Sequence, residues 1–229
     1  MSQRARIVAL VSALAVVVAA VVGYELAVRP SATTSTSASR SAAPAAPSQR
    51  PTADAENTPA GDSSILVVYF SRTKGVYGGD LTVGNTARIA QMIQDRTGAD
   101  SYEIVPLADY PSDYQETTEV AQEELDADAR PEIRDPLPDV SGYDTVFVGA
   151  PIWWGEYPMV VRTFLDAVDL NGKTVIPFTT HEGSGLGNTQ QQLEAQYPQA
   201  TVLDGLAVRG SQAADAEPDV DAWLENLGL

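Results

Sequence analysis

From residue 65 onward, the hydrophobic positions switch repeatedly between the spacing of a buried strand and the spacing of a helix face. The predicted strands are 65–70, 101–105, 143–149, 174–179 (where Pro177 leaves the register open) and 201–208. The predicted helices cover 86–96, 114–128, 160–168, 188–195 and a last segment with Trp223, Leu224 and Leu227 on its inner face. Strands that alternate with helices are joined by crossovers, so they run parallel and helices cover both sheet faces. The pattern therefore predicts a doubly wound α/β domain.

The amino-terminal part of the chain carries a long apolar run. Residues 7–23 are almost entirely apolar, and the run extends to residue 28 with only Glu25 interrupting it. A spanning helix needs about 20 apolar residues, whereas a signal peptide needs about 7–15. Because no small-x-small cleavage site follows directly, we expect 1–29 to be an uncleaved membrane anchor, with a cleaved signal and a secreted domain as the alternative. Two arginines before the run against one after it place the rest of the chain outside the cytoplasm.

Residues 30–62 consist mainly of Ala, Ser, Thr and Pro, with few large apolar side chains. Such a segment cannot bury enough surface to offset the entropy lost on ordering, so we expect a flexible linker. The predicted organisation is an amino-terminal anchor or signal over 1–29, a linker over 30–62 and one domain over 63–229.

Composition excludes several classes of function. The formal net charge is −17, and nine basic residues stand against 27 acidic ones after Asp62. This charge repels nucleic acid and favours a basic partner through long-range fields, or it simply keeps the surface solvated. The absence of cysteine excludes thiol catalysis, disulfides and iron–sulfur ligation. The single histidine, His181, excludes a histidine-rich metal site.

Three turns rich in ligand-binding residue types follow three of the predicted strands. Ser71-Arg72-Thr73 follows the first, and Asn85-Thr86 begins the next helix, where free N–H groups and the helix dipole favour a phosphate. Pro151-Ile152-Trp153-Trp154-Gly155 follows the third, and its large aromatics suit a flat ligand. Thr180-His181-Glu182-Gly183-Ser184-Gly185 follows the fourth, and its glycines allow close approach of the backbone. Because carboxyl ends of parallel strands share one edge, the turns are expected to line one crevice.

Each turn also has a purely structural interpretation. Asn85 can serve as a helix cap and Ser71 as a turn residue. One or both tryptophans can pack into the core. His181 can donate to a ligand or can bond to its own loop, and a single histidine implies no acid–base role.

Together, the motifs resemble the flavodoxin-like family over roughly residues 64–229. The similarity is carried by Tyr69-Phe70-Ser71-Arg72-Thr73, Gly84-Asn85-Thr86, Pro151-Ile152-Trp153-Trp154-Gly155 and Thr180-His181-Glu182-Gly183-Ser184-Gly185. The resemblance implies a five-stranded parallel sheet in the order 2-1-3-4-5 and a non-covalently bound FMN.

The resemblance also assigns cofactor-binding positions. Ser71, Thr73, Asn85 and Thr86 would hold the phosphate, with Arg72 of the same turn counted among the binding residues. The turn 151–155 would line the isoalloxazine, with Trp153 or Trp154 against the ring, and 180–185 would close the other side. The family's phosphate loop is usually contiguous, Ser-x-Thr-Gly-Asn-Thr, whereas here residues 74–83 separate Thr73 from Gly84. An insertion that leaves and returns at the same corner would preserve the phosphate site.

Three functions are consistent with this reasoning. The first is an FMN redox protein that passes electrons to a partner protein through its acidic surface. The second is an FMN-dependent NAD(P)H:quinone-type reductase, for which a membrane anchor would give access to lipid-soluble acceptors. The third is an anchored scaffold or binding module that retains the fold without flavin. Nearby negative charge is expected to lower the reduction potential of a bound flavin through repulsion.

Overall fold

The computed structural model describes residues 64–229, so the expected anchor at 1–29 and linker at 30–62 lie outside the described residues. Within residues 64–229, no helix is both long and apolar enough to cross a membrane. The strands are β1 (Ile65–Tyr69), β2 (Asp100–Glu103), β3 (Thr145–Pro151), β4 (Thr174–His181), β5 (Thr201–Val202) and β6 (Leu206–Arg209). All pair in parallel, in the order β2-β1-β3-β4-β5, with β6 also beside β4. The predicted α/β class and the order 2-1-3-4-5 are confirmed.

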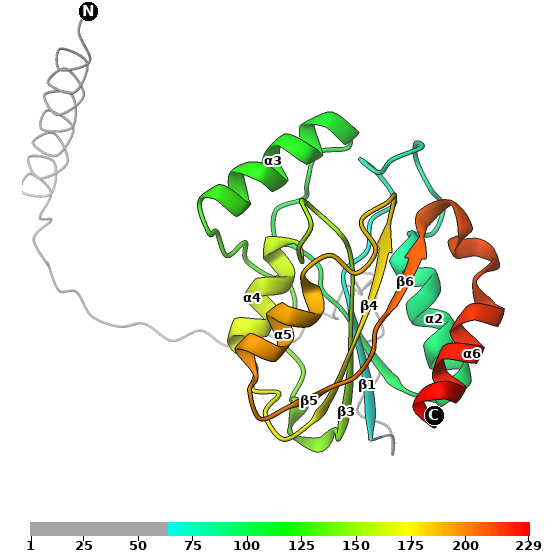
Figure 1. Ribbon diagram of the computed structural model, residues 1–229. Coiled ribbons are helices and arrows are strands. Elements are labelled where there is room, and N and C mark those ends of the chain that lie inside the picture. Colours follow the sequence, from blue (N-terminus) through cyan, green and yellow to red (C-terminus); the bar gives the residue numbers. More distant parts are fainter. Residues whose placement is uncertain (1–63) are drawn as a thin grey trace, which may run out of the picture. The chain divides into compact units, whose positions relative to one another are not determined.

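Helices cover both faces of the sheet (Figure 1). The helices are α2 (Asn85–Thr97), α3 (Tyr114–Asp126), α4 (Met159–Ala167), α5 (Thr189–Gln196) and α6 (Glu217–Leu227), with short 3-10 turns at Val140–Gly142 and Gly210–Asp215. Helices α2 and α6 lie against one face, and α4 and α5 lie against the other. Helix α3 lies above the carboxyl ends of the strands, where it can take part in a site.

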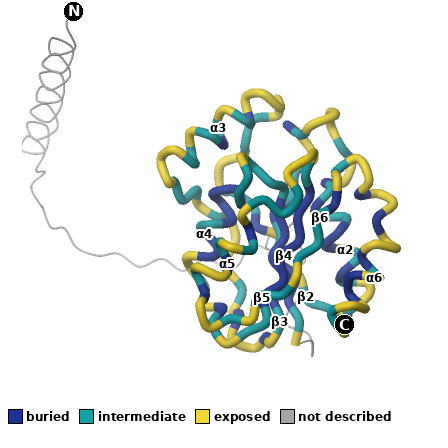
Figure 2. Tube along the Cα trace, viewed as in Figure 1, coloured by how far each residue is buried: buried dark blue, intermediate teal, exposed yellow. Residues whose placement is uncertain are grey.

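The two-residue alternation of each strand divides the core into two layers. On β1, Leu66 and Val68 pack on the side of α4 and α5, whereas Val67 packs against α2 and α6. All three are at most 1% exposed, in keeping with strands buried on both faces. Figure 2 shows this buried interior running along the strands, with exposed residues on the loops and on the outer sides of the helices.

The predicted fifth strand, 201–208, is wrong as a continuous element. Val175 of β4 pairs with Val202, and Phe178 of β4 pairs with Leu206. Between these two pairs β4 has two residues, whereas the neighbouring segment has three. Pro177 lies at this break, and proline has no N–H to donate to a ladder. Gly205 fits the irregular segment because a Cβ there would stand 2.6 Å from the Pro177 carbonyl oxygen. The strand is therefore divided into β5 and β6.

Candidate functional site

One cavity of about 590 Å³ lies at the carboxyl ends of β1, β3 and β4. Its size is within the range of small-molecule pockets, roughly 300–1,000 Å³. Fourteen of the predicted site residues line it: Ser71, Arg72, Asn85, Thr86, Pro151, Ile152, Trp153, Trp154, Gly155, Thr180, His181, Glu182, Gly183 and Ser184. Thr73 and Gly185 are not among the lining residues. The three turns thus form one crevice, while the contact of each residue with a cofactor stays a prediction.

The corner between β1 and α2 offers hydrogen-bond donors to an anion. The Ser71 Oγ accepts from the Ala87 N–H at 3.0 Å and so caps α2, which begins at Asn85 without a cap from Gly84. Because Ser71 accepts through its lone pair, its own proton is free to donate. The first turn of α2 contains no acidic residue. A Cβ at Gly84 would lie 2.2 Å from the Ser71 Oγ, so only glycine allows this close approach.

A pair of hydroxyl groups joins α2 to β4 next to this corner. The Thr86 and Thr180 Oγ1 atoms lie 2.8 Å apart, and both residues are at most 5% exposed. One hydroxyl donates to the other, so the accepting hydroxyl retains a proton that it can donate to a ligand. Together with Ser71, the pair gives the corner neutral donors of the kind that a phosphate requires.

The two adjacent tryptophans have different environments. Trp153 is partly buried and packs edge-on against Tyr110 and Phe70, with ring centroids 4.9 and 5.6 Å away. Trp154 is 56% exposed, and its Nε1 donates to the Thr118 carbonyl oxygen at 3.1 Å. Trp154 is therefore the ring available to stack on a flat ligand, and Trp153 supports the wall behind it.

The turn that carries Trp154 is strained. Trp154 and Gly155 have φ angles of +52° and +87°, a pair typical of a two-residue hairpin turn. Trp153 and Glu156 close it with hydrogen bonds of 3.1 and 3.0 Å. A bulky residue at positive φ is an outlier that costs of order 1–3 kcal/mol. The surrounding contacts hold this strain, since the Asn188 N–H donates to the Gly155 carbonyl oxygen at 2.8 Å.

Comparisons with known proteins agree with this geometry. The family model described as flavodoxin matches residues 64–227. The chain belongs to the flavodoxin family. A protein assigned as a flavoprotein from Bacteroides eggerthii DSM 20697 is 32% identical, with a TM-score of 0.60, covering 73% of this chain and 99% of its own. A similar one from Bacteroides uniformis ATCC 8492 is 29% identical, with a TM-score of 0.59, covering 71% and 98%.

A third solved structure shares the fold. It is a flavoprotein from Lactobacillus acidophilus NCFM in complex with FMN, 21% identical, with a TM-score of 0.51, covering 68% of this chain and 99% of its own. No match to a curated protein was found. Membership of the flavodoxin family supports FMN as the cofactor. The residues present fit it, because neutral donors lie at the start of α2 and an exposed tryptophan lines the same cavity.

Arg72, which the resemblance counts among the binding residues, is held by contacts with other residues of the chain. Its guanidinium donates to the Thr117 Oγ1 and to the Pro111 carbonyl oxygen, at 3.1 and 2.6 Å. It also lies 5.3 Å from the centre of the Tyr110 ring. Burial lowers the pKa of Arg72 from its usual value, against the opposing effects of Tyr110 and Asp109. Arg72 therefore ties the β1 turn to α3, although it still lines the cavity.

His181 bonds to its own loop and keeps one donor free. Its Nδ1 accepts from the Gly183 N–H at 2.9 Å, which fixes the neutral ring with a proton on Nε2. Burial lowers the pKa of His181, and the charge of Arg209 lowers it further. The ring is therefore neutral at pH 7 and can donate from Nε2 into the cavity that it lines.

Residues 74–83, which the family resemblance predicts to be an insertion and which we call the insertion below, leave and return at the same corner. The Leu81 N–H donates to the Thr73 carbonyl oxygen at 2.8 Å, which closes the excursion. Gly75 has a φ of +61°, and a Cβ there would stand 2.4 Å from the Thr117 Oγ1 of α3. The insertion is thus packed against α3 and contributes Gly75, Val76 and Tyr77 to the cavity.

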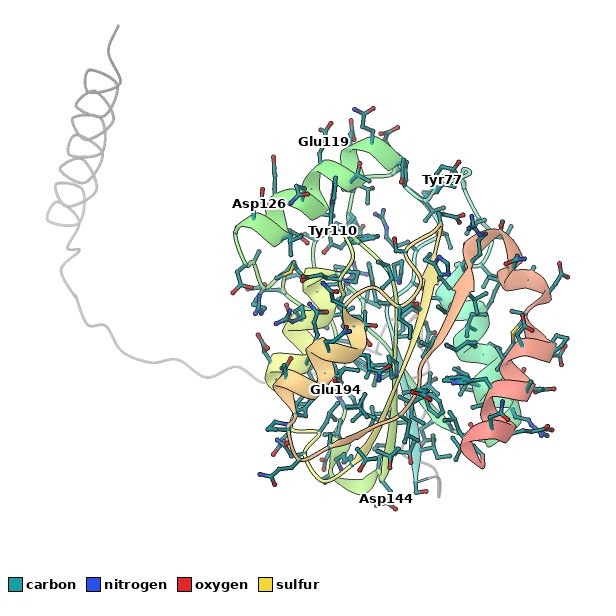
Figure 3. The ribbon with its side chains drawn as sticks, in the orientation of Figure 1. Tyr77, Tyr110, Glu119, Asp126, Asp144 and Glu194 are labelled. Carbon is teal, nitrogen blue, oxygen red and sulfur yellow. The ribbon has the colours of Figure 1, made fainter. Side chains whose placement is uncertain are left out.

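Sequence reasoning did not assign the insertion or α3 to the cavity. The lining residues it missed are Gly75, Val76, Tyr77, Tyr114, Thr117, Thr118, Ala121 and Gly210. One signal was present in α3, where Thr117 and Ala121 are small residues four apart in a helix otherwise dominated by charge. Figure 3 shows Tyr77 beside α3 and Tyr110 beneath it, while Glu119 points outward.

Proposed function

We propose that this protein is an FMN-binding redox protein whose role is to transfer electrons to a partner. The observation that carries the proposal is that one cavity joins the hydroxyl-rich start of α2 to the exposed ring of Trp154. These two features suit the two chemically different parts of FMN, its phosphate and its flat ring.

Residues of this chain would hold FMN from several sides. Ser71, the Thr86–Thr180 pair and the first N–H groups of α2 would donate to the phosphate. Trp154 would stack on the ring, and His181 would donate from Nε2. FMN, when bound, supplies the redox chemistry, while the protein supplies position and electrostatics.

Electron transfer to a protein fits the charge of this domain. Five acidic side chains lie on α3 alone, next to the cavity, and no basic residue lies on that helix. Opposite charge on a partner steers association and makes its rate depend on salt. The partner class that fits is therefore a basic redox protein. The expected anchor at 1–29, outside the described residues, would hold the domain at an extracytoplasmic membrane surface.

An FMN-dependent NAD(P)H:quinone-type reductase is the second candidate. Exposed aromatic side chains at the mouth of the cavity favour it, because they could receive a small flat acceptor. A scaffold that retains the fold without flavin would follow only if FMN does not bind.

Cytochrome c, a basic haem protein, serves as a probe for electron transfer. The FMN-loaded protein, reduced by light with EDTA as the electron donor in the absence of oxygen, should pass electrons to it with a rate that falls at least about tenfold between 0.02 and 0.5 M salt. A slow or salt-independent rate would contradict a docking role for the acidic surface. Steady NAD(P)H oxidation with a quinone would instead favour the reductase.

A further inference from the structure

Three exposed aromatic side chains gather at one edge of the cavity. Tyr77 of the insertion is 64% exposed, Tyr114 of α3 is 47% exposed and Trp154 is 56% exposed. Within residues 64–229, every other Tyr, Trp and Phe is buried or half-buried. The three come from segments far apart in sequence, yet all line the same cavity. We call Tyr77, Tyr114 and Trp154 the aromatic rim.

Contacts between the segments hold the aromatic rim in place. Tyr77 and Tyr114 pack edge to face, with ring centroids 5.9 Å apart and planes at 73°. The close packing of Gly75 on Thr117 fixes the insertion against α3. The bond from Trp154 Nε1 to Thr118 fixes the turn against the same helix. A rim that is ordered beforehand loses little entropy when it binds a ligand.

We propose that the aromatic rim is a second binding subsite, which takes a neutral, flat aromatic carbonyl compound of the quinone type. Aromatic faces favour a flat aromatic ligand, and the exposed rings would lose contact with water on binding. The hydroxyls of Tyr77 and Tyr114 have no hydrogen-bond partner among the described residues, so both can donate to carbonyl oxygens.

Charge selects against an anionic ligand at the rim. Asp80, Asp113 and Glu116 lie in the segments that carry the two tyrosines, and Lys74 is the only basic residue there. The nearby guanidinium of Arg72 is turned toward Thr117 and Pro111. A ligand with a sulfonate or phosphate would meet net repulsion, whereas a neutral quinone would not.

The subsite is distinct from the predicted phosphate corner. It is built largely by the insertion and α3, whereas the corner lies between β1 and the start of α2. Only Trp154 belongs to both the rim and the predicted flavin wall. The role of the bound compound as an electron acceptor rests on the FMN function proposed above, but its binding to the rim does not.

Binding of 2-methyl-1,4-naphthoquinone and of anionic 1,4-naphthoquinone-2-sulfonate to the full chain tests the proposal. Titration calorimetry would be run on the FMN-loaded and FMN-free protein, with FMN affinity measured separately for each variant. We expect the neutral quinone to bind at least about tenfold more tightly than the sulfonate. The double variant Tyr77→Ala, Tyr114→Ala should weaken neutral quinone binding about tenfold and leave FMN affinity within about twofold.

Leu137→Ala provides the matched control, because Leu137 is 37% exposed and does not line the cavity. It should leave quinone binding unchanged. Equal quinone binding by the double variant and the wild type would overturn the proposal, as would equal binding of the sulfonate. An equal loss of FMN affinity in the double variant would assign the rim to the flavin instead. If the wild type fails to bind FMN, the proposed function fails, and quinone binding to the flavin-free chain still decides the subsite.

Discussion

Trp153 and Trp154 are neighbours in sequence, but their side chains occupy different environments in the structure. Trp153 fills space between Phe70 and Tyr110, whereas Trp154 is exposed and strained on the cavity wall. Backbone strain at an exposed aromatic residue lowers the stability of the fold. Such strain clusters at functional sites. The pair therefore separates a residue that packs the core, Trp153, from a residue that we propose binds the flavin, Trp154.

Substitution of each tryptophan should show this separation. Trp153→Ala should lower the free energy of unfolding by about 2–3 kcal/mol, because it removes a packed ring. Trp154→Asn should change it by less than about 1 kcal/mol, since asparagine tolerates positive φ, and should weaken FMN binding about tenfold. Denaturant unfolding and FMN titration measure the two effects. Unchanged FMN affinity in Trp154→Asn would show that this ring does not stack on the flavin.

His181 gives a direct test of the electrostatics, because the chain has a single imidazole to observe. Its lowered pKa means that the folded state binds a proton less readily than the unfolded state. The contribution of His181 to stability should therefore decrease as pH falls below about 6.5, through the window down to the folded pKa. NMR titration should give a pKa below 6.5. A value above 6.5 would contradict the described environment of the ring.

The insertion and α3 pack together as one structural unit. Gly75 allows them to meet, and Arg72 joins the same helix to the end of β1. Both contacts involve Thr117, a buried threonine on the inner side of α3. The position of α3 over the cavity therefore depends on Gly75 and Arg72, together with the hydrogen bond from the Tyr110 hydroxyl to Glu124 of the same helix.

Two glycines in the insertion allow a matched test of this unit. Gly75 and Gly78 both have positive φ, but a Cβ on Gly78 would meet nothing within 4 Å. Gly78→Ala should cost about 1 kcal/mol of unfolding free energy through backbone strain alone. Gly75→Ala should cost about 1–2 kcal/mol more, because its Cβ also collides with Thr117 and Pro111. Equal losses in denaturant unfolding would show that the insertion does not pack on α3.

The fold was predictable from the sequence because strands and helices leave regular apolar patterns. The buried run at 65–70 and the helical spacing of Ile89, Ala90 and Ile93 both recur in the structure. The break between β5 and β6 was not predicted, because Pro177 left the register of its own strand open but the position where the neighbouring strand breaks depends on how the two strands pair. The aromatic rim was also missed, because its members meet only through packing between an irregular insertion and a charged helix.

The excess of acidic residues over basic ones should affect the reduction potential of bound FMN. The chain has 31 acidic and 14 basic residues. Negative charge around a bound flavin disfavours the gain of electrons, and salt screens this effect. The midpoint potential of the couple that forms the fully reduced, anionic FMN should lie below that of free FMN and should rise as salt increases from about 0.05 to 0.5 M. Spectroelectrochemistry would test this; a potential above that of free FMN would contradict it.

The proposed function depends on FMN binding in one cavity, with its phosphate at the start of α2. The most direct measurement is the affinity of the full chain for FMN and for riboflavin, which lacks the phosphate, in the wild type and in Ser71→Ala. Thr97→Ala is the control, because its hydroxyl lies at the other end of the same helix and bonds to Ile93.

We predict one-to-one FMN binding that is at least about tenfold tighter than riboflavin binding, since hydrogen bonds to charged groups contribute about 1.5–3 kcal/mol. Ser71→Ala should weaken FMN binding about tenfold and leave riboflavin binding nearly unchanged, while Thr97→Ala should alter neither. Equal affinity for FMN and riboflavin would rule out a phosphate site at the start of α2, and no binding of FMN at micromolar concentration would rule out FMN as the cofactor.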